Sequence, residues 1–168
     1  MKRRPPLSPA LFACIVAVLA ATTVWGFEPS SVQSLIKTKK CRTCDLAKAN
    51  LNKADLGNAD LKLARMPGVT LAGANLRRAS LIGAIMHGVD LGGADLSDAD
   101  MTGAYLREAN LGGANLRGAD LTGVILSGAD LTGADMTGAI LKHAVLDGAV
   151  FCRTKRPSGR EDSSSCPR

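Results

Sequence analysis

A strict five-residue period is the feature that most constrains how this chain can fold. From Leu46 to Phe151 every fifth residue is large and apolar, and the 22 positions hold seventeen Leu, four Met and one Phe. Two residues before each of them stands Ala in eighteen cases, Val in three and Cys44 once. A helix would spread these leucines around its surface, because five residues advance by about 140° beyond a full turn. The pattern therefore excludes a long amphipathic helix, and thirteen Gly at the fifth position would destabilise one further.

The repeated unit A-(D/N)-L-x-x, as in Ala109-Asn-Leu-Gly-Gly, resembles the pentapeptide-repeat family over residues 44–153. The resemblance implies an all-β fold, a right-handed quadrilateral β-helix (a solenoid) with four units in each coil. The 22 units would then make about five and a half coils, and at about 4.8 Å per coil a rod about 26 Å long. The central Leu and the Ala two residues earlier point inward at alternate positions of a short extended segment, while the two residues after Leu turn the corner.

Stacked coils need covered ends, because a bare last coil exposes its core and an unpaired edge. Residues 27–43 are predicted to form an N-terminal cap with a short helix, for which Ser30 is the N-cap candidate. Val32, Leu35 and Ile36 would lay its apolar face over the first coil. At the other end, Phe151 is predicted to plug the final coil. Residues 154–168, rich in Ser, Pro and Arg, are predicted to fold back as a C-terminal loop cap.

Residues 1–26 have the organisation of a signal peptide. Three basic residues open the chain, an unbroken apolar run follows at residues 11–21, and Val24 and Gly26 are small residues at the −3 and −1 positions before Phe27. The sequence therefore predicts a periplasmic or secreted protein. An uncleaved segment that anchors the protein in the membrane is the alternative interpretation. Lipidation of Cys14 is excluded, because this residue lies at the start of the apolar run and not at its end.

Removal of the signal peptide, which contains Cys14, would leave Cys41, Cys44, Cys152 and Cys166. An even number of cysteines in an oxidising compartment favours disulfides. The segments that hold them resemble those that flank the repeats of exported family members, and this resemblance implies the disulfides Cys41–Cys44 and Cys152–Cys166. A zinc site and a thioredoxin-like redox site are the alternatives. A zinc ion needs its ligands close together, whereas the two pairs would lie about 26 Å apart along the rod. The redox site would need its C-x-x-C at a helix N-terminus in a βαβ unit.

The sequence shows no Ser/His/Asp grouping, phosphate-binding loop or metal motif, which predicts a protein that is not an enzyme and has no cofactor or metal. His87 and His143 lie on turns nearly three coils apart, too far to share an ion. Asp or Asn occupies thirteen of the 22 outward positions before the central residue. These side chains are predicted to form solvated walls that bond to nearby backbone, since they lack the clustered carbonyl and bidentate geometry that calcium requires.

Charge argues against a nucleic-acid partner. Between Cys44 and Arg153 the chain has ten basic and twelve acidic residues, with no continuous basic face and few stacking aromatics. The predicted function is a non-catalytic exported scaffold or protein-interaction module. The alternative that the resemblance brings is a DNA-mimic topoisomerase-binding protein of the quinolone-resistance type. That activity requires a strongly acidic rod in the cytosol, which the export signal and the basic ends of this chain disfavour.

One wall of the predicted rod departs from the polar pattern. Taken at twenty-residue spacing, the outward positions of the first wall are Asp45, Arg65, Ile85, Tyr105, Ile125 and Val145. The second, third and fourth walls, which pass through Asn110, Asp95 and Asp100, are polar for most of their length. We interpret Ile85, Tyr105, Ile125 and Val145 as a candidate interface with a protein partner or a second, weakly associating copy. The alternative is cross-rung packing, since Ile and Tyr pair well on neighbouring strands.

Overall fold

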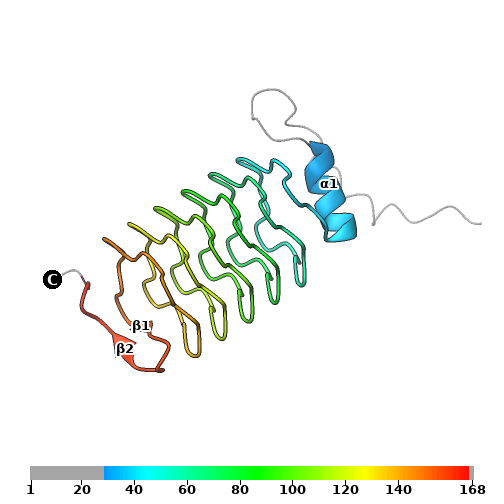
Figure 1. Cartoon of the computed structure of the whole chain (residues 1–168). Helices are drawn as coiled ribbons and strands as arrows, with labels where there is room; N and C mark the ends of the chain where they lie inside the picture. Colours follow the sequence, from blue (N-terminus) through cyan, green and yellow to red (C-terminus); the bar gives the residue numbers. More distant parts are fainter. Residues whose placement is uncertain (1–28, 167–168) are drawn as a thin grey trace, which may run out of the picture.

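A computed structural model describes residues 29–166 of the chain, and the predicted signal peptide lies outside them. Figure 1 shows a rod of stacked coils with helix α1 (Pro29–Thr38) across one end. At the other end lie two short strands, β1 (Thr154–Lys155) and β2 (Glu161–Asp162). No helix within residues 29–166 has both the length and the apolar character that crossing a bilayer demands.

Parallel bridges define the coils. Each bridge joins a residue to the one twenty positions later, from Lys40–Asp60 to Asp135–Lys155, and successive bridges are five residues apart. Twenty residues per coil and five per wall give a four-sided parallel solenoid, as the period predicts. The bridged ladder begins earlier and ends later than the predicted range of 44–153, because the flanking segments add strand-like residues at both ends.

The core of the solenoid consists of the inward Leu, Met, Ala and Val side chains. From Leu46 to Met136 every central side chain is at most 2% exposed. Each unit closes its corner with a hydrogen bond from the Ala N–H to the preceding Leu carbonyl, as from Ala114 to Leu111 at 3.0 Å. The second residue after Leu has a positive φ, as in type II turns, which is why Gly is frequent there. Leu63 adopts the same conformation at φ 57° without being Gly.

Helix α1 covers the first coil. Val32 and Leu35 are 4% and 0% exposed and belong to the same core as the coils. Two details of the prediction were wrong. The helix begins at Pro29, a favourable first helical residue, so Ser30 lies within the first turn and not before it. Ile36 is 50% exposed, because α1 crosses the end of the rod and only a narrow face of the helix meets the core.

The C-terminal segment forms a hairpin, which corrects the prediction of a loop cap. Strand β2 pairs antiparallel with β1 in the register Thr154–Asp162 and Lys155–Glu161. The Arg156 guanidinium lies 3.6 Å from the centre of the Phe151 ring and bonds Asp162 at 2.6 Å. Phe151 is buried, but Leu141 and Leu146 in the same coil remain partly exposed. The hairpin and Phe151 therefore close only part of this end.

Candidate interaction surface

The outward Asp and Asn residues complete the hydrogen bonding of each unit. In the unit Ala109–Gly113 the backbone N–H groups of Ala109, Asn110, Leu111 and Gly113 all donate to backbone carbonyls. The fifth, that of Gly112, donates to Asn110 Oδ1 at 3.0 Å. A side-chain oxygen of Asp or Asn that accepts from the backbone N–H two residues later forms an Asx turn.

All thirteen outward Asp and Asn residues make this bond, at 2.8–3.5 Å. The prediction that they bond nearby backbone is confirmed.

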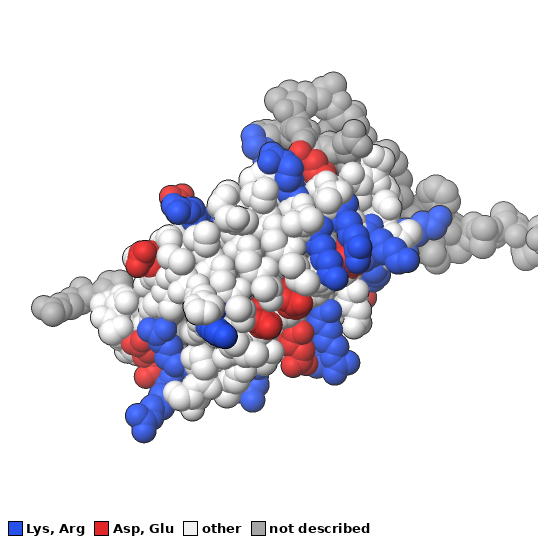
Figure 2. Space-filling model, viewed as in Figure 1, with Lys and Arg blue, Asp and Glu red and all other residues white. Residues whose placement is uncertain are grey.

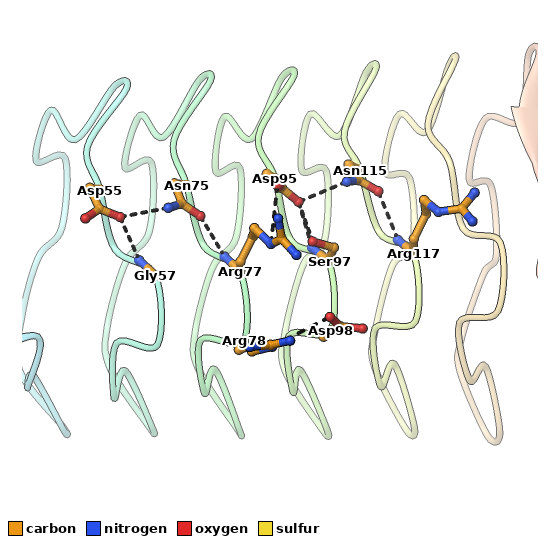
Figure 3. A network of polar contacts seen from close by, with 10 residues as sticks. All are labelled: Asp55, Gly57, Asn75, Arg77, Arg78, Asp95, Ser97, Asp98, Asn115 and Arg117. Atoms are coloured by element: carbon orange, nitrogen blue, oxygen red, sulfur yellow. Dashed lines mark hydrogen bonds and ion pairs between the residues drawn. The ribbon is translucent and has the colours of Figure 1, made fainter.

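Asp and Asn alternate along the third wall and join its rungs (Figure 3). Asn75 donates to Asp55 Oδ1 at 2.8 Å, and Asn115 donates to Asp95 Oδ1 at 3.0 Å. An amide between two carboxylates keeps like charges from facing each other on adjacent rungs. Arg77 approaches Asp95 at 3.9 Å on the same wall. This wall is a satisfied polar ladder, with no unpaired group aimed at a ligand among the residues shown.

Several aspartates are held in their ionised form by these bonds. The Thr137 hydroxyl, assisted by its backbone N–H, by Arg117 and by Lys155, lowers the pKa of Asp135 to about 2. Bonds from Ser164 and Arg156 lower the pKa of Asp162 to about 2. The Arg42 side chain, 2.5 Å away, lowers the pKa of Asp60. Carboxyl groups with lowered pKa values do not donate protons near neutral pH, which disfavours them as general acids.

The apolar residues on the first wall cannot form the Asx hydrogen bond. Where Ile85, Tyr105 and Ile125 replace Asp or Asn, the N–H groups of His87, Arg107 and Ser127 find no acceptor among residues 29–166. A hydrogen bond of this kind contributes about 1 kcal/mol net. Each apolar residue of this wall therefore replaces a stabilising local contact.

We call Ile85, Tyr105, Ile125 and Val145 the apolar stripe. The bridges Ile85–Tyr105, Tyr105–Ile125 and Ile125–Val145 place its members on consecutive rungs, as the spacing predicts. Tyr105 is 42% exposed and Val145 38%, while Ile85 and Ile125 are half-buried. The outward side chains thus form one continuous apolar surface about 14 Å long.

His87 borders the apolar stripe, a contact that the sequence analysis missed. Its ring meets that of Tyr105 edge to face, with 6.0 Å between the centroids. The two residues are eighteen positions apart, so the twenty-residue register places them on adjacent rungs and could have revealed the pair. His143 is exposed at a distant corner, as its spacing predicts.

Both predicted cysteine pairs are bonded in the structure. Cys41 and Cys44 have Cα atoms 5.4 Å apart, and Cys152 and Cys166 have theirs 4.5 Å apart. The first pair lines a shallow depression together with Lys40, Arg42 and serines of α1. Within the described part of the chain no three His, Cys, Asp or Glu side chains gather as metal ligands would.

Figure 2 shows a group of basic side chains near the end of the rod that α1 covers, and side chains of both signs at the middle and the opposite end of the same face. Exposed Lys40, Arg42, Lys53 and Arg65 belong to that first part of the solenoid. Charge of both signs is thus spread along the rod.

Comparison with known proteins decides the family. The family model described as "Pentapeptide repeats" matches the chain in eight copies, over residues 41–62, 68–98, 99–138 and 131–155. This chain belongs to the pentapeptide-repeat family. Proteins of the family fold as right-handed quadrilateral β-helices and are generally non-enzymatic structural or interaction proteins.

Solved structures of other pentapeptide-repeat proteins resemble the chain. HetL of the cyanobacterium Nostoc, involved in heterocyst differentiation regulation, is 33% identical with a TM-score of 0.47, and the match covers 73% of this chain and 66% of HetL. Rfr23 of the cyanobacterium Cyanothece is 28% identical with a TM-score of 0.38, over 76% of this chain and 95% of Rfr23. Full-length QnrB1, a plasmid-mediated fluoroquinolone resistance protein, is 20% identical with a TM-score of 0.41, over 67% of this chain and 65% of QnrB1. No curated protein matched the chain.

Proposed function

We propose that this protein is an exported, non-catalytic scaffold that binds another protein through the apolar stripe. The observation that carries the proposal is the replacement of the Asx bond by outward apolar side chains on consecutive rungs of one wall, of which Tyr105 and Val145 are exposed and Ile85 and Ile125 half-buried. Selection for stability alone would favour Asp or Asn there, as on the other walls.

Tyr105 is the anchor of the proposed contact. It is the only tyrosine of the chain, lies at the middle of the apolar stripe and is 42% exposed. Tyrosine can bury its ring against a partner while its hydroxyl stays in contact with water, and it is enriched among residues that dominate binding energy. His87 packs against the edge of this ring and limits its orientation. The stripe is narrow, so we expect a modest interface below the standard size of about 800 Å² per partner.

Export and the absence of catalysis complete the proposal. Residues 1–26 have the composition of a signal peptide, and disulfide-bonded cysteines fit an oxidising compartment. A DNA-mimic function is not favoured, because exposed basic residues lie at both ends of the described rod, among them Arg42 and Arg153. A fusion of the N-terminal segment to a reporter that is active only after export tests the location.

The partner contact is tested by co-purification from the native cells. The parent and the double variant Tyr105→Asn/Ile125→Asp are recovered under the same conditions, and the bound proteins are identified by mass spectrometry. We expect the double variant to lose at least one partner that the parent retains. Thr70→Asn, which places the same residue at an outward position of the second wall, is the matched control and should retain that partner. Recovery of the same partners in the same yield by all three proteins would contradict the proposal.

A further inference from the structure

Positive charge is concentrated at the end of the rod that α1 covers. Residues 29–65, which run from α1 through the first coil, contain eight basic and three acidic residues. Residues 66–150 contain five basic and nine acidic residues. The first part of the rod therefore has an excess of five positive charges, whereas the middle has an excess of four negative charges. Figure 2 shows the group of basic side chains near the end that α1 covers.

The acidic residues of this first part do not neutralise the excess. Each of them already has a basic partner, in the ion pairs Asp45–Arg65, Asp55–Lys39 and Asp60–Arg42 at 2.5–3.4 Å. The ammonium groups of Lys37, Lys40 and Lys53 form no ion pair with another residue of the described chain. All three side chains are exposed, so much of the excess charge lies on lysines that no ion pair within the fold uses.

The lysines surround this end of the rod and do not line a single wall. Lys37 lies on α1, Lys40 extends the fourth wall by one rung before the first coil, and Lys53 lies at the corner between the second and third walls. Lys48 and Lys62 lie at the two corners that bound the first wall. We call these five lysines the lysine collar. A flat surface beside one wall would meet only some of them, whereas a surface that faces the end meets all five.

An exposed apolar side chain lies at the same end. Helix α1 packs Val32 and Leu35 onto the core but leaves Ile36, next to Lys37, 50% exposed. The Ile36 side chain therefore contributes little to covering the first coil. Apolar and lysine side chains together on the exposed part of a helix are typical of helices that lie at a membrane interface.

We propose that this end of the rod binds the surface of an anionic lipid membrane. The lysine collar lies at the phospholipid headgroups, and Ile36 reaches the boundary between headgroups and acyl chains. Each lysine near an anionic membrane adds to the attraction, which falls off within a Debye length.

The chemistry of this end fits a membrane better than a soluble polyanion. The three lysines without ion pairs act as point charges, which suits a diffuse anionic surface, whereas arginine forks suit individual phosphate groups. Residues 29–65 contain no aromatic side chain on which the bases of a nucleic acid could stack. In addition, the apolar run at residues 11–21 precedes this end in the sequence, so the proposed export would leave this end next to the membrane.

Binding in this orientation leaves the apolar stripe accessible. The stripe begins at Ile85, two rungs and about 10 Å along the rod from Asp45. The membrane contact is therefore separate from the proposed protein contact and does not rest on the apolar stripe.

Co-sedimentation of the purified protein with lipid vesicles tests the proposal. One set of vesicles contains phosphatidylglycerol, which is anionic, and the other consists of phosphatidylcholine alone. We expect binding to the first set only, and its loss as the salt concentration rises. Lys40→Glu/Lys53→Glu should lower the partition coefficient about tenfold or more, and Ile36→Ser should lower it several-fold.

Arg153→Glu/Arg160→Glu is the matched control, because it makes the same change of charge at the opposite end of the rod. Arg153 occupies the same corner as Lys53, and the two residues have φ values of 54° and 57°. This control variant should bind the anionic vesicles like the parent. Equal loss of binding by both charge variants would show that net charge and not the lysine collar is responsible, and would overturn the proposal.

The stripe variant Tyr105→Asn/Ile125→Asp separates this proposal from the proposed function. It should bind the vesicles like the parent, whereas Lys40→Glu/Lys53→Glu should keep the protein partner. Equal binding of the parent to both sets of vesicles would overturn the proposal, because it would show insertion of an apolar segment. A parent that does not bind the anionic vesicles, whether or not it binds the soluble polyanion heparin, would also overturn it.

Discussion

At the scale of the residue, the structure explains why Asp and Asn occupy the position before the central Leu. In units such as Ala109–Gly113, four N–H groups bond to backbone carbonyls and the Asx side chain accepts from the fifth. The unit that contains Arg65 follows the same rule without an Asx side chain. It has Pro67 at the position where other units have the fifth N–H. Proline has no N–H, so no acceptor is needed there.

Asp130 offers a direct test of this role, since among the described residues its side chain accepts one hydrogen bond, from Thr132 N–H at 2.8 Å. Asp130→Ala should lower the free energy of unfolding by about 1 kcal/mol, because the N–H loses its acceptor. Asp130→Asn keeps a carbonyl oxygen at the same place and should lie within a few tenths of a kcal/mol of the parent, about the size expected for a benign surface change. Urea denaturation of the three proteins measures both values. Equal losses for Ala and Asn would contradict the role of the oxygen.

Acid stability follows from the lowered pKa of Asp135, about 2 compared with 3.8 for an ordinary Asp. A carboxyl group whose pKa is lowered by folding stabilises the protein above the unfolded pKa, and this contribution disappears as the pH falls through the folded pKa. Stability should therefore decrease between about pH 4 and pH 2. Asp135→Asn should show a shallower decrease in this window when urea midpoints are compared at pH 7, 4 and 2.5. An identical pH profile for parent and variant would show that Asp135 is not responsible.

At the scale of the element, the coils and their caps are stabilised by different contacts. The coils rest on repeated inward side chains and rung hydrogen bonds, whereas α1 depends on Val32 and Leu35 alone among its described apolar residues for burial. Lys39 reinforces this end by donating from Nζ to the Asp55 carbonyl oxygen, an acceptor of the first coil. The cap is thus a small element with few contacts, and each one matters.

Leu35→Ala and Ile36→Ala form a matched pair on adjacent residues of α1. Leu35 is fully buried, so its truncation should cost about 2–5 kcal/mol and expose the first coil. Ile36 is 50% exposed, and its truncation should cost less than about 1 kcal/mol. Thermal and chemical denaturation give both values. A larger loss for Ile36 than for Leu35 would reverse the assigned orientation of the helix.

The C-terminal hairpin depends on the disulfide Cys152–Cys166, which spans fourteen positions of the sequence. Cys152→Ser/Cys166→Ser should lower the free energy of unfolding by about 3 kcal/mol, because the closed loop restricts the unfolded chain. The Cys41–Cys44 disulfide closes a much shorter loop, so Cys41→Ser/Cys44→Ser should lower the free energy of unfolding by less. Mass spectrometry of the non-reduced parent should recover both linkages. A peptide joining Cys41 or Cys44 to Cys152 or Cys166 within one chain would contradict the rod.

The sequence predicted the coils far better than the caps. Every coil repeats the same five-residue logic, so the positions of Leu116, Asn115 and Tyr105 follow from counting. Residues 154–166 carry no period, and their hairpin arises from single contacts such as Arg156 with Asp162 and with the Phe151 ring. The partly exposed Leu141 and Leu146 were unpredictable for the same reason, because the pattern says which residues point inward and not what covers them.

At the scale of the whole molecule, the rod has three polar walls, one wall with an apolar stripe, one sealed end and one half-open end. The polar walls are hydrogen-bonded within themselves, so their side chains serve the fold. The apolar stripe serves it poorly, since it leaves backbone N–H groups without acceptors in the described chain. We therefore assign binding to the apolar stripe and stability to the polar walls.

The free energy of unfolding of Tyr105→Asn/Ile125→Asp, measured by chemical denaturation, tests this assignment most directly. The new side chains can accept from the N–H groups of Arg107 and Ser127, which the parent leaves without a partner in residues 29–166. If the apolar stripe exists for binding, the double variant should be at least as stable as the parent, by up to about 1 kcal/mol for each bond gained. A loss of more than about 1 kcal/mol would show that Tyr105 and Ile125 stabilise the rod by packing across rungs, and would contradict the central claim.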